Sequence, residues 1–209
     1  MSENERMRIL VVGASGTLGR AIVSELGGRH DIIAAGSKSG DIRIDIADPA
    51  SIVAAFAAAG PLDAVACAAG AVNFAPLSAF APAGVAGSLY GLGLANKLMG
   101  QVNLALAARD ALRDGGSITL ITGILADQPI AQGSSASMVN GAIEAFARAA
   151  AIELPRGLRI NVVSPTVFVE SMEGYGPFFR GFEPVPVAKA ALAFSRSIEG
   201  RQTGQIYRV

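Results

Sequence analysis

The chain has 209 residues, of which 51% are hydrophobic, and its 17 basic and 17 acidic side chains cancel. A neutral chain of this size fits a single domain, here residues 1–209, and has no bulk field to attract nucleic acid or anionic lipid. No apolar run reaches the roughly 18 residues of a membrane span, and the polar, acidic N-terminus does not resemble a signal peptide. Its one cysteine, Cys67, leaves no internal disulfide to form. We therefore expect a soluble cytoplasmic protein.

The first predicted element is a short apolar strand at residues 8–13, which leads into a glycine-rich turn. The turn has the spacing G-x-x-G-x-x-G at Gly13, Gly16 and Gly19, and a helical pattern follows it. Glycines at such a turn allow a tight reversal, close approach of a diphosphate, and close packing of helix on strand. The amides at the helix N-terminus then face the phosphates. We predict a nucleotide site here, formed by Gly13, Ser15, Gly16, Thr17, Leu18 and Gly19.

Further along the chain, strand-like and helical patterns alternate. Strands are predicted at residues 31–35, 42–46, 62–67, 117–122, 158–163 and 204–209, and helices at residues 16–27, 49–59, 92–113, 136–153 and 186–198. This alternation predicts an α/β fold: a Rossmann-type, doubly wound parallel sheet of about seven strands with helices on both faces. Residues 36–40 are too few to hold a crossover helix, so a loop is expected there.

The end of the second predicted strand indicates which dinucleotide is preferred. A protein that selects NAD usually has a carboxylate there for the ribose hydroxyls, whereas this chain has Ser37, Lys38 and Ser39 and no carboxylate before Asp41. A lysine flanked by serines suits the extra phosphate of NADP. NADP is therefore favoured over NAD. The alternative is a solvated loop whose lysine contacts nothing.

Three other polar residues have structural interpretations. Cys67 ends an apolar run, which is typical of a packed, unreactive thiol. His30 is the sole histidine and is expected in an exposed turn, so there is no Cys/His cluster and no metal site is predicted. Asn161 is expected to tie neighbouring loops together through hydrogen bonds.

The segment 167–184 contains five aromatic residues among glycines. Such a segment suits a short lid over a small apolar ligand. It suits a subunit contact nearly as well, because aromatic residues are enriched in interface cores.

Taken together, these motifs resemble the short-chain dehydrogenase/reductase family over essentially the whole chain. The glycine turn resembles an atypical version of its cofactor motif. Asp45-Ile46-Ala47-Asp48 is similar to its adenine-contacting Asp-x-x-Asp element, although Asp45 also suits a turn or a helix N-cap. Cys67-Ala68-Ala69-Gly70 stands in place of its Asn-Asn-Ala-Gly, and Asn161-Val-Val-Ser-Pro165 is similar to its segment beside the nicotinamide. The cofactor contacts that the resemblance implies are Asp45, Ile46, Ala68, Ala69, Gly70, Pro165, Thr166 and Val167.

The same resemblance exposes a departure at the catalytic positions. The family's Tyr-x-x-x-Lys pair aligns with Ala136 and Asn140, and its serine aligns with Gly123, directly after Thr122. Its helical asparagine, in turn, aligns with Lys97. An inward-pointing Lys97 would have a lowered pKa and would be a candidate proton donor, whereas lysines on helices usually lie on solvated faces.

The candidate catalytic residues are therefore Lys97, Thr122, Ser135 and Asn140. The serines at positions 134, 135 and 137 surround the position of the missing tyrosine and suit a substrate oxygen, but at least one of them is expected to cap the helix instead.

Three hypotheses of function follow. The first is an NADP-dependent oxidoreductase acting on a small carbonyl or alcohol. The second is a non-catalytic NADP-binding redox sensor or assembly protein, and the third is a structural protein that has lost the cofactor. The helices predicted at residues 92–113 and 136–153 are rich in small residues, and the resemblance implies that they form the dimer contact, as the corresponding helices do in the family. A homodimer or homotetramer is therefore expected.

Overall fold

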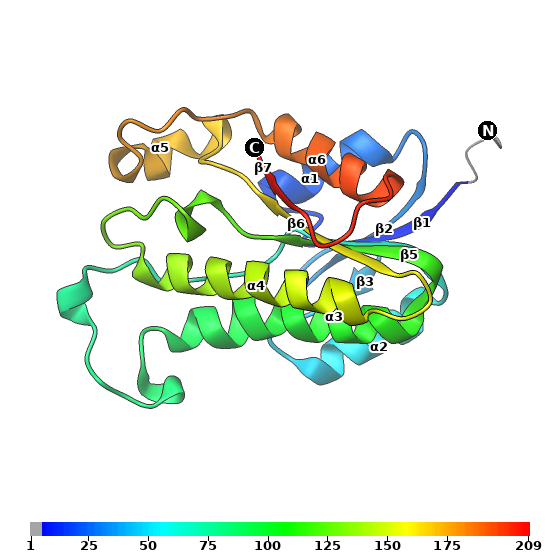
Figure 1. Ribbon diagram of the computed structural model, residues 1–209, viewed down its shortest axis with the longest axis horizontal. Coiled ribbons are helices and arrows are strands. Elements are labelled where there is room, and N and C mark those ends of the chain that lie inside the picture. The colour runs from blue at the N-terminus through cyan, green and yellow to red at the C-terminus, as the bar shows by residue number, and fades with distance from the viewer. Residues whose placement is uncertain (1–5) are drawn as a thin grey trace.

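A computed structural model describes residues 6–209 and contains one parallel sheet of seven strands (Figure 1). The strand order across the sheet is β3-β2-β1-β4-β5-β6-β7. The strands are β1 (Arg8–Val12), β2 (Asp31–Gly36), β3 (Ile42–Arg43), β4 (Leu62–Cys67), β5 (Leu112–Ile121), β6 (Arg159–Ser164) and β7 (Ile206–Arg208). The predicted doubly wound Rossmann-type sheet is confirmed.

Helices cover both faces of this sheet. Figure 1 shows α1 (Thr17–Leu26) and α6 (Val187–Glu199) on one face, and α2 (Pro49–Ala59), α3 (Met99–Ala111) and α4 (Ser134–Glu153) on the other. Strand β1 shows how the two cores form, because successive side chains of a strand point to opposite faces. Ile9 and Val11 pack toward α1 and α6, while Leu10 and Val12 pack toward α2, α3 and α4.

Several predicted boundaries differ from the observed ones. Strand β3 has only two residues because it lies at the edge of the sheet and its partner β2 ends at Gly36. The helix predicted over residues 92–113 is a π-helical turn, η3 (Gly93–Leu98), followed by α3, and β5 already begins at Leu112. Residues 36–40 contain no helix, as expected, and join two parallel strands directly.

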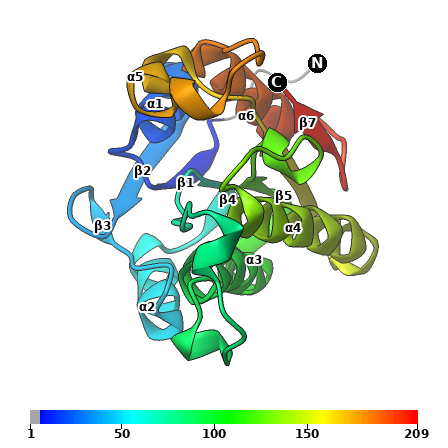
Figure 2. The ribbon, with the colours of Figure 1, turned by 90° about the vertical axis from the view of Figure 1, so that its left-hand side faces the viewer.

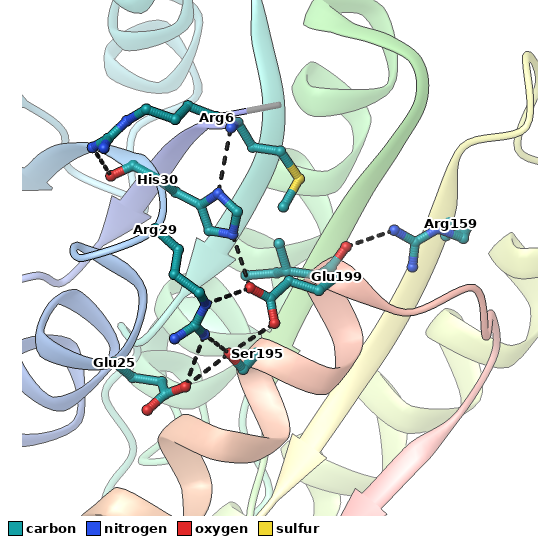
Figure 3. Close-up of polar contacts among 9 residues, drawn as sticks. Arg6, Glu25, Arg29, His30, Arg159, Ser195 and Glu199 are labelled. Carbon is teal, nitrogen blue, oxygen red and sulfur yellow. Dashed lines mark hydrogen bonds and ion pairs between the residues drawn. The ribbon is translucent and has the colours of Figure 1, made fainter. Parts of the chain in front are cut away.

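The predicted position of His30 in an exposed turn is wrong. Its side chain is buried, with Nδ1 accepting a hydrogen bond from the backbone N–H of Met7 and Nε2 lying 2.9 Å from Glu199. Arg29 also binds Glu199, at 2.8 Å (Figure 3). Burial alone would raise the pKa of Glu199, but hydrogen bonds from Arg29 and His30 hold that pKa below its usual value. The cluster fastens the C-terminal end of α6 to the turn before β2.

None of the helices within residues 6–209 is long and apolar enough to cross a membrane. The same residues contain no group of three or more His, Cys, Asp or Glu side chains placed to hold a metal ion.

Candidate functional site

The carboxyl ends of the parallel strands meet at one edge of the sheet, which faces the viewer in Figure 2. Several hollows open near this edge, and two of them adjoin each other at Gly70. The first, called here the nucleotide crevice, has a volume of about 360 Å³. Its lining comes from the glycine turn, the loops after β2, β3 and β4, and η3: Val12, Gly13, Ser15, Gly16, Gly36, Ser37, Lys38, Ile44, Asp45, Ile46, Ala68, Ala69, Gly70, Ala71 and Asn96.

The glycine turn packs closely against the loop after β4 and leads directly into α1. Gly13 has a φ of +83°, and a Cβ there would lie 2.9 Å from the carbonyl oxygen of Ala68. The N-cap of α1, Gly16, offers no side-chain cap, and no acidic residue lies in the first turn. The first-turn amides are therefore available to an anion. Thr17, Leu18 and Gly19 form that turn, with Leu18 and Gly19 buried beneath it.

The loops after β2 and β3 supply the polar lining of the crevice. Ser37 and Lys38 line it directly, whereas Ser39 lines a neighbouring hollow. Asp45 lines the crevice and accepts a hydrogen bond from the backbone N–H of Ala47, as a turn residue does; its contact with adenine stays a prediction. The helix N-cap expected as one alternative for Asp45 is instead Asp48.

The second hollow, called here the aromatic pocket, has a volume of about 270 Å³ and shares Gly70 with the crevice. Its lining combines several apolar side chains with a few polar ones: Gly70, Val72, Phe74, Lys97, Thr122, Gly123, Ile124, Leu125, Ala136, Asn140, Pro165, Thr166, Val167, Phe168, Ser171, Tyr175 and Phe179. The three positions aligned with the family's serine, tyrosine and lysine all lie here. So does Lys97.

Lys97 points inward and contacts Asn140. Its Nζ donates a hydrogen bond of 2.8 Å to Oδ1 of Asn140, whose Nδ2 donates in turn to the carbonyl oxygen of Gly123 at 3.3 Å. A Cβ at Gly70 would lie 2.6 Å from Cγ of Lys97, so glycine at that position makes room for the lysine stem. Burial lowers the pKa of Lys97 to about 8. The pocket thus contains an ammonium group with a readily lost proton.

The hydroxyl of Thr122 is already engaged. It donates to Glu144 at 3.0 Å, and Glu144 receives two hydrogen bonds from Arg208, at 2.7 and 2.8 Å. A carboxylate paired in this way only accepts hydrogen bonds, so the hydroxyl proton of Thr122 is committed to it. Thr122 therefore has no hydrogen left to donate to a substrate oxygen.

The serines near the start of α4 do not have their predicted capping role. The helix N-cap is Gly133, and no side chain caps the helix. Ser134 is the first helical residue, and its Oγ lies 3.2 Å from the hydroxyl of Tyr90. Ser135 is buried with its hydroxyl unpaired among the described residues, and it does not line the aromatic pocket.

The aromatic segment packs over the aromatic pocket. It contains η5 (Val169–Ser171), α5 (Met172–Tyr175) and η6 (Gly176–Phe178), and its ends are joined where Phe168 pairs with Val185. Tyr175 meets Phe74 edge-on, with ring centroids 6.0 Å apart. Phe179 is buried in the pocket wall, whereas Phe178 remains 40% exposed.

Phe74 and Asn96 line the two hollows but were not among the predicted site residues. Phe74 lies in a stretch without periodicity, so nothing in the sequence indicated that it reaches the pocket. Asn96 lines the crevice and accepts a hydrogen bond of 2.8 Å from the backbone N–H of Ala71. The structural interpretations of Asn161 and Cys67 agree with the structure. Asn161 is fully buried and bridges Ser197, Gln202 and Gln205 through hydrogen bonds. Cys67 is a buried thiol, and burial raises its pKa to about 11.

Known proteins match the chain over most of its length. A family profile described as Enoyl-(Acyl carrier protein) reductase matches residues 20–206. The chain belongs to the short-chain dehydrogenase/reductase family. A search of curated proteins gave no match.

Solved structures of similar fold cover nearly the whole chain. The protein lin1944 from Listeria innocua is 48% identical with a TM-score of 0.93, over 97% of this chain and 99% of that one. A small-chain dehydrogenase in complex with NADPH is 23% identical with a TM-score of 0.83, over 98% and 97% of the two chains. A blue fluorescent protein from a metagenomic library, also in complex with NADPH, is 23% identical with a TM-score of 0.84, over 99% and 98%.

Proposed function

We propose that the protein is an NADP-dependent oxidoreductase that transfers hydride between the nicotinamide ring and a small carbonyl or alcohol substrate. One observation carries the proposal. The nucleotide crevice adjoins, at Gly70, a pocket that holds the ammonium group of Lys97. Two structures of similar fold contain NADPH, which supports the choice of cofactor. The aromatic lining and small volume suit a flat or compact substrate under a short lid, residues 167–184.

The end of β2 supports NADP over NAD. Lys38 is exposed at the crevice, with Ser37 and Ser39 beside it. The nearest following carboxylate, Asp41, accepts a hydrogen bond of 2.9 Å from the backbone N–H of Ala34. It is therefore directed back onto β2. A phosphate on the adenosine ribose would meet a cation here, and a bare ribose would lack its usual carboxylate partner.

In this proposal Lys97 is the proton donor, in place of the family's tyrosine, which this chain lacks. The bound nicotinamide supplies or accepts the hydride. The residues of the chain hold the reactants together and donate or accept the proton. In reduction, Lys97 donates a proton to the substrate oxygen while Asn140 fixes the position of its Nζ. Thr122 is a poor donor because its hydroxyl hydrogen is bound to Glu144, and Ser135 is a poor donor because it does not line the pocket. Pro165, Thr166 and Val167 form the wall on the β6 side.

Cofactor binding and turnover test the proposal separately. The purified protein is titrated with NADPH and with NADH by fluorescence, and a panel of small carbonyl compounds is then screened by cofactor absorbance. We expect tighter binding of NADPH than of NADH, and consumption of NADPH with at least one carbonyl. Failure of both nucleotides to bind would contradict the proposal and select a structural protein that has lost its cofactor.

A second candidate function is a non-catalytic NADP-binding redox sensor or assembly protein. It is favoured by one observation, namely that Gly123, Ala136 and Asn140 line the pocket where the family has its serine, tyrosine and lysine. This candidate predicts tight NADPH binding, no turnover across the panel, and a specific partner protein.

We also propose a homodimer or homotetramer assembled through α3 and α4. Apolar side chains on and beside these helices are exposed: Met99 at 45%, Leu106 at 43%, Met138 at 43% and Ile152 at 87%. Burial of such a surface between two copies is the usual way to remove it from water. Sedimentation should give the mass of two or four chains, and the mass of one chain would contradict the assembly. A cytoplasmic location stays a prediction.

A further inference from the structure

A side hollow adjoins the nucleotide crevice at the glycine turn. It is lined by residues of the turn, the first half of α1 and the loop after β2: Ala14, Ser15, Arg20, Val23, Ser24, Ala34, Ser39 and Gly40. Ser15 lines both hollows. Two cations therefore stand near this turn. Arg20 comes from α1 on the side-hollow side, and Lys38 comes from the loop on the crevice side.

Arg20 is held at this junction without a counter-ion. Its Nη1 donates a hydrogen bond to the carbonyl oxygen of Ser15, and the residue is exposed. Within residues 6–209 it forms no ion pair, and neither does Lys38. Six of the other arginines within residues 6–209 form ion pairs with carboxylates, as Arg156 does with Asp114 and Arg208 does with Glu144. A neutral carbonyl positions the guanidinium of Arg20 but leaves its charge uncompensated.

The donor set at this junction matches a phosphate. A guanidinium has five N–H donors in a planar fork, and the contact with Ser15 uses a donor of only one nitrogen, Nη1. Lys38 adds a second cation, and the hydroxyl of Ser39 lies on the same loop. Nearby carboxylates are engaged by backbone amides, Asp41 with Ala34 and Asp45 with Ala47. A dianion placed here would be bound from both sides.

We propose that Arg20 is the principal ligand of the phosphate on the adenosine ribose of NADP, with Lys38 opposite it. The inference rests on the proposed function, because it assumes that the nucleotide crevice binds NADP. It adds a residue that the motif at the end of β2 does not contain, and it places cofactor selection on α1 as well as on that loop. The preference for NADP then depends on Arg20 more than on the lysine, since a fork binds a phosphate with directed hydrogen bonds.

Calorimetry on the full chain tests the role of Arg20 without any need for activity. The probes are NADPH, NADH, adenosine 2′,5′-bisphosphate and 5′-AMP. For Arg20→Gln we expect affinities for NADPH and for the bisphosphate to fall about 10–100-fold. Affinities for NADH and 5′-AMP should change by less than about twofold. Arg20→Lys should retain part of the preference for NADPH over NADH, because lysine keeps the positive charge but lacks the planar set of guanidinium N–H donors.

Arg43→Gln is the matched control, because Arg43 is an exposed arginine on β3 that lines neither hollow. It should leave all four affinities nearly unchanged. The proposal is overturned if Arg20→Gln leaves NADPH affinity intact, if it weakens NADPH and NADH equally, or if Arg43→Gln has the same effect. Failure of the unmodified protein to bind either dinucleotide would instead overturn the proposed function. Equal melting temperatures of the variants and the parent would exclude a folding defect.

Discussion

Replacement of Lys97 by methionine is expected to lower the rate of NADPH-dependent carbonyl reduction by about 10²–10⁴-fold, the usual contribution of a general acid. Methionine keeps most of the length of the side chain and removes the proton. Affinity for NADPH should change little, because Lys97 lines the aromatic pocket and not the nucleotide crevice. The measurement is kcat/KM at saturating NADPH. The matched control is Lys189→Met, which changes an exposed lysine on α6.

The pH dependence of reduction should reflect the ionisation of Lys97. Burial lowers the pKa of Lys97 to about 8, and reduction needs the protonated ammonium. The rate is therefore highest below pH 8 and falls as the pH rises through that value. In Asn140→Asp, a carboxylate would face the ammonium across the present 2.8 Å hydrogen bond. An opposite charge favours the charged form, so the falling limb should move to higher pH.

A direct titration removes the need for a known substrate. The chain has three lysines, Lys38, Lys97 and Lys189, so isotope labelling of lysine Cε should give three resonances. One resonance should titrate near pH 8, and the Lys97→Met variant should lack it. If all three resonances titrate near the ordinary lysine value, or if the variant keeps the parent's rate, Lys97 is not the proton donor.

Much of the fold was predictable because each element depends on local pattern. Strand β4 and helix α2 were predicted with their observed bounds, since apolar runs and a Pro at the helix start are local signals. The bounds of β3 were not predictable. Ile44 and Ile46 are buried like strand residues, but the hydrogen-bonded ladder ends with β2, which is a property of the partner strand. His30 shows the same limit, because its burial depends on Glu199, 169 residues away.

The site was predictable where a motif fixes the backbone and less so where side chains compete for partners. Gly13 and Gly16 line the crevice as their spacing indicated. The resemblance to the family brought Lys97 and Asn140 together, and the structure places them in one pocket. It gave no indication that Glu144 accepts the hydrogen bond of the Thr122 hydroxyl or that Ser135 does not line the pocket. Whether a side-chain donor such as the Thr122 hydroxyl is free depends on neighbours that are distant in the sequence, and a local motif does not reveal them.

The pair formed by Arg208 and Glu144 should dominate the effect of substitutions on stability. Glu144 is buried, with its side chain 3% exposed, and Arg208 at the end of β7 binds both of its oxygens. Arg208→Met leaves that carboxylate without its cation. Removal of one partner of a buried pair is costly, and because Arg208 is partly exposed we expect a loss of about 3 kcal/mol in the free energy of unfolding.

Neutralising the carboxylate should reverse part of that loss. In the double variant Arg208→Met with Glu144→Gln, no buried charge is left unpaired, so the protein should be more stable than Arg208→Met alone. Arg109→Met is the control, because Arg109 pairs with Asp110 on the surface and such pairs contribute at most about 1 kcal/mol. Urea denaturation of the four proteins measures each difference. An Arg208→Met variant as stable as Arg109→Met, or a double variant less stable than Arg208→Met, would mean that the pair does not make the contribution to stability expected here.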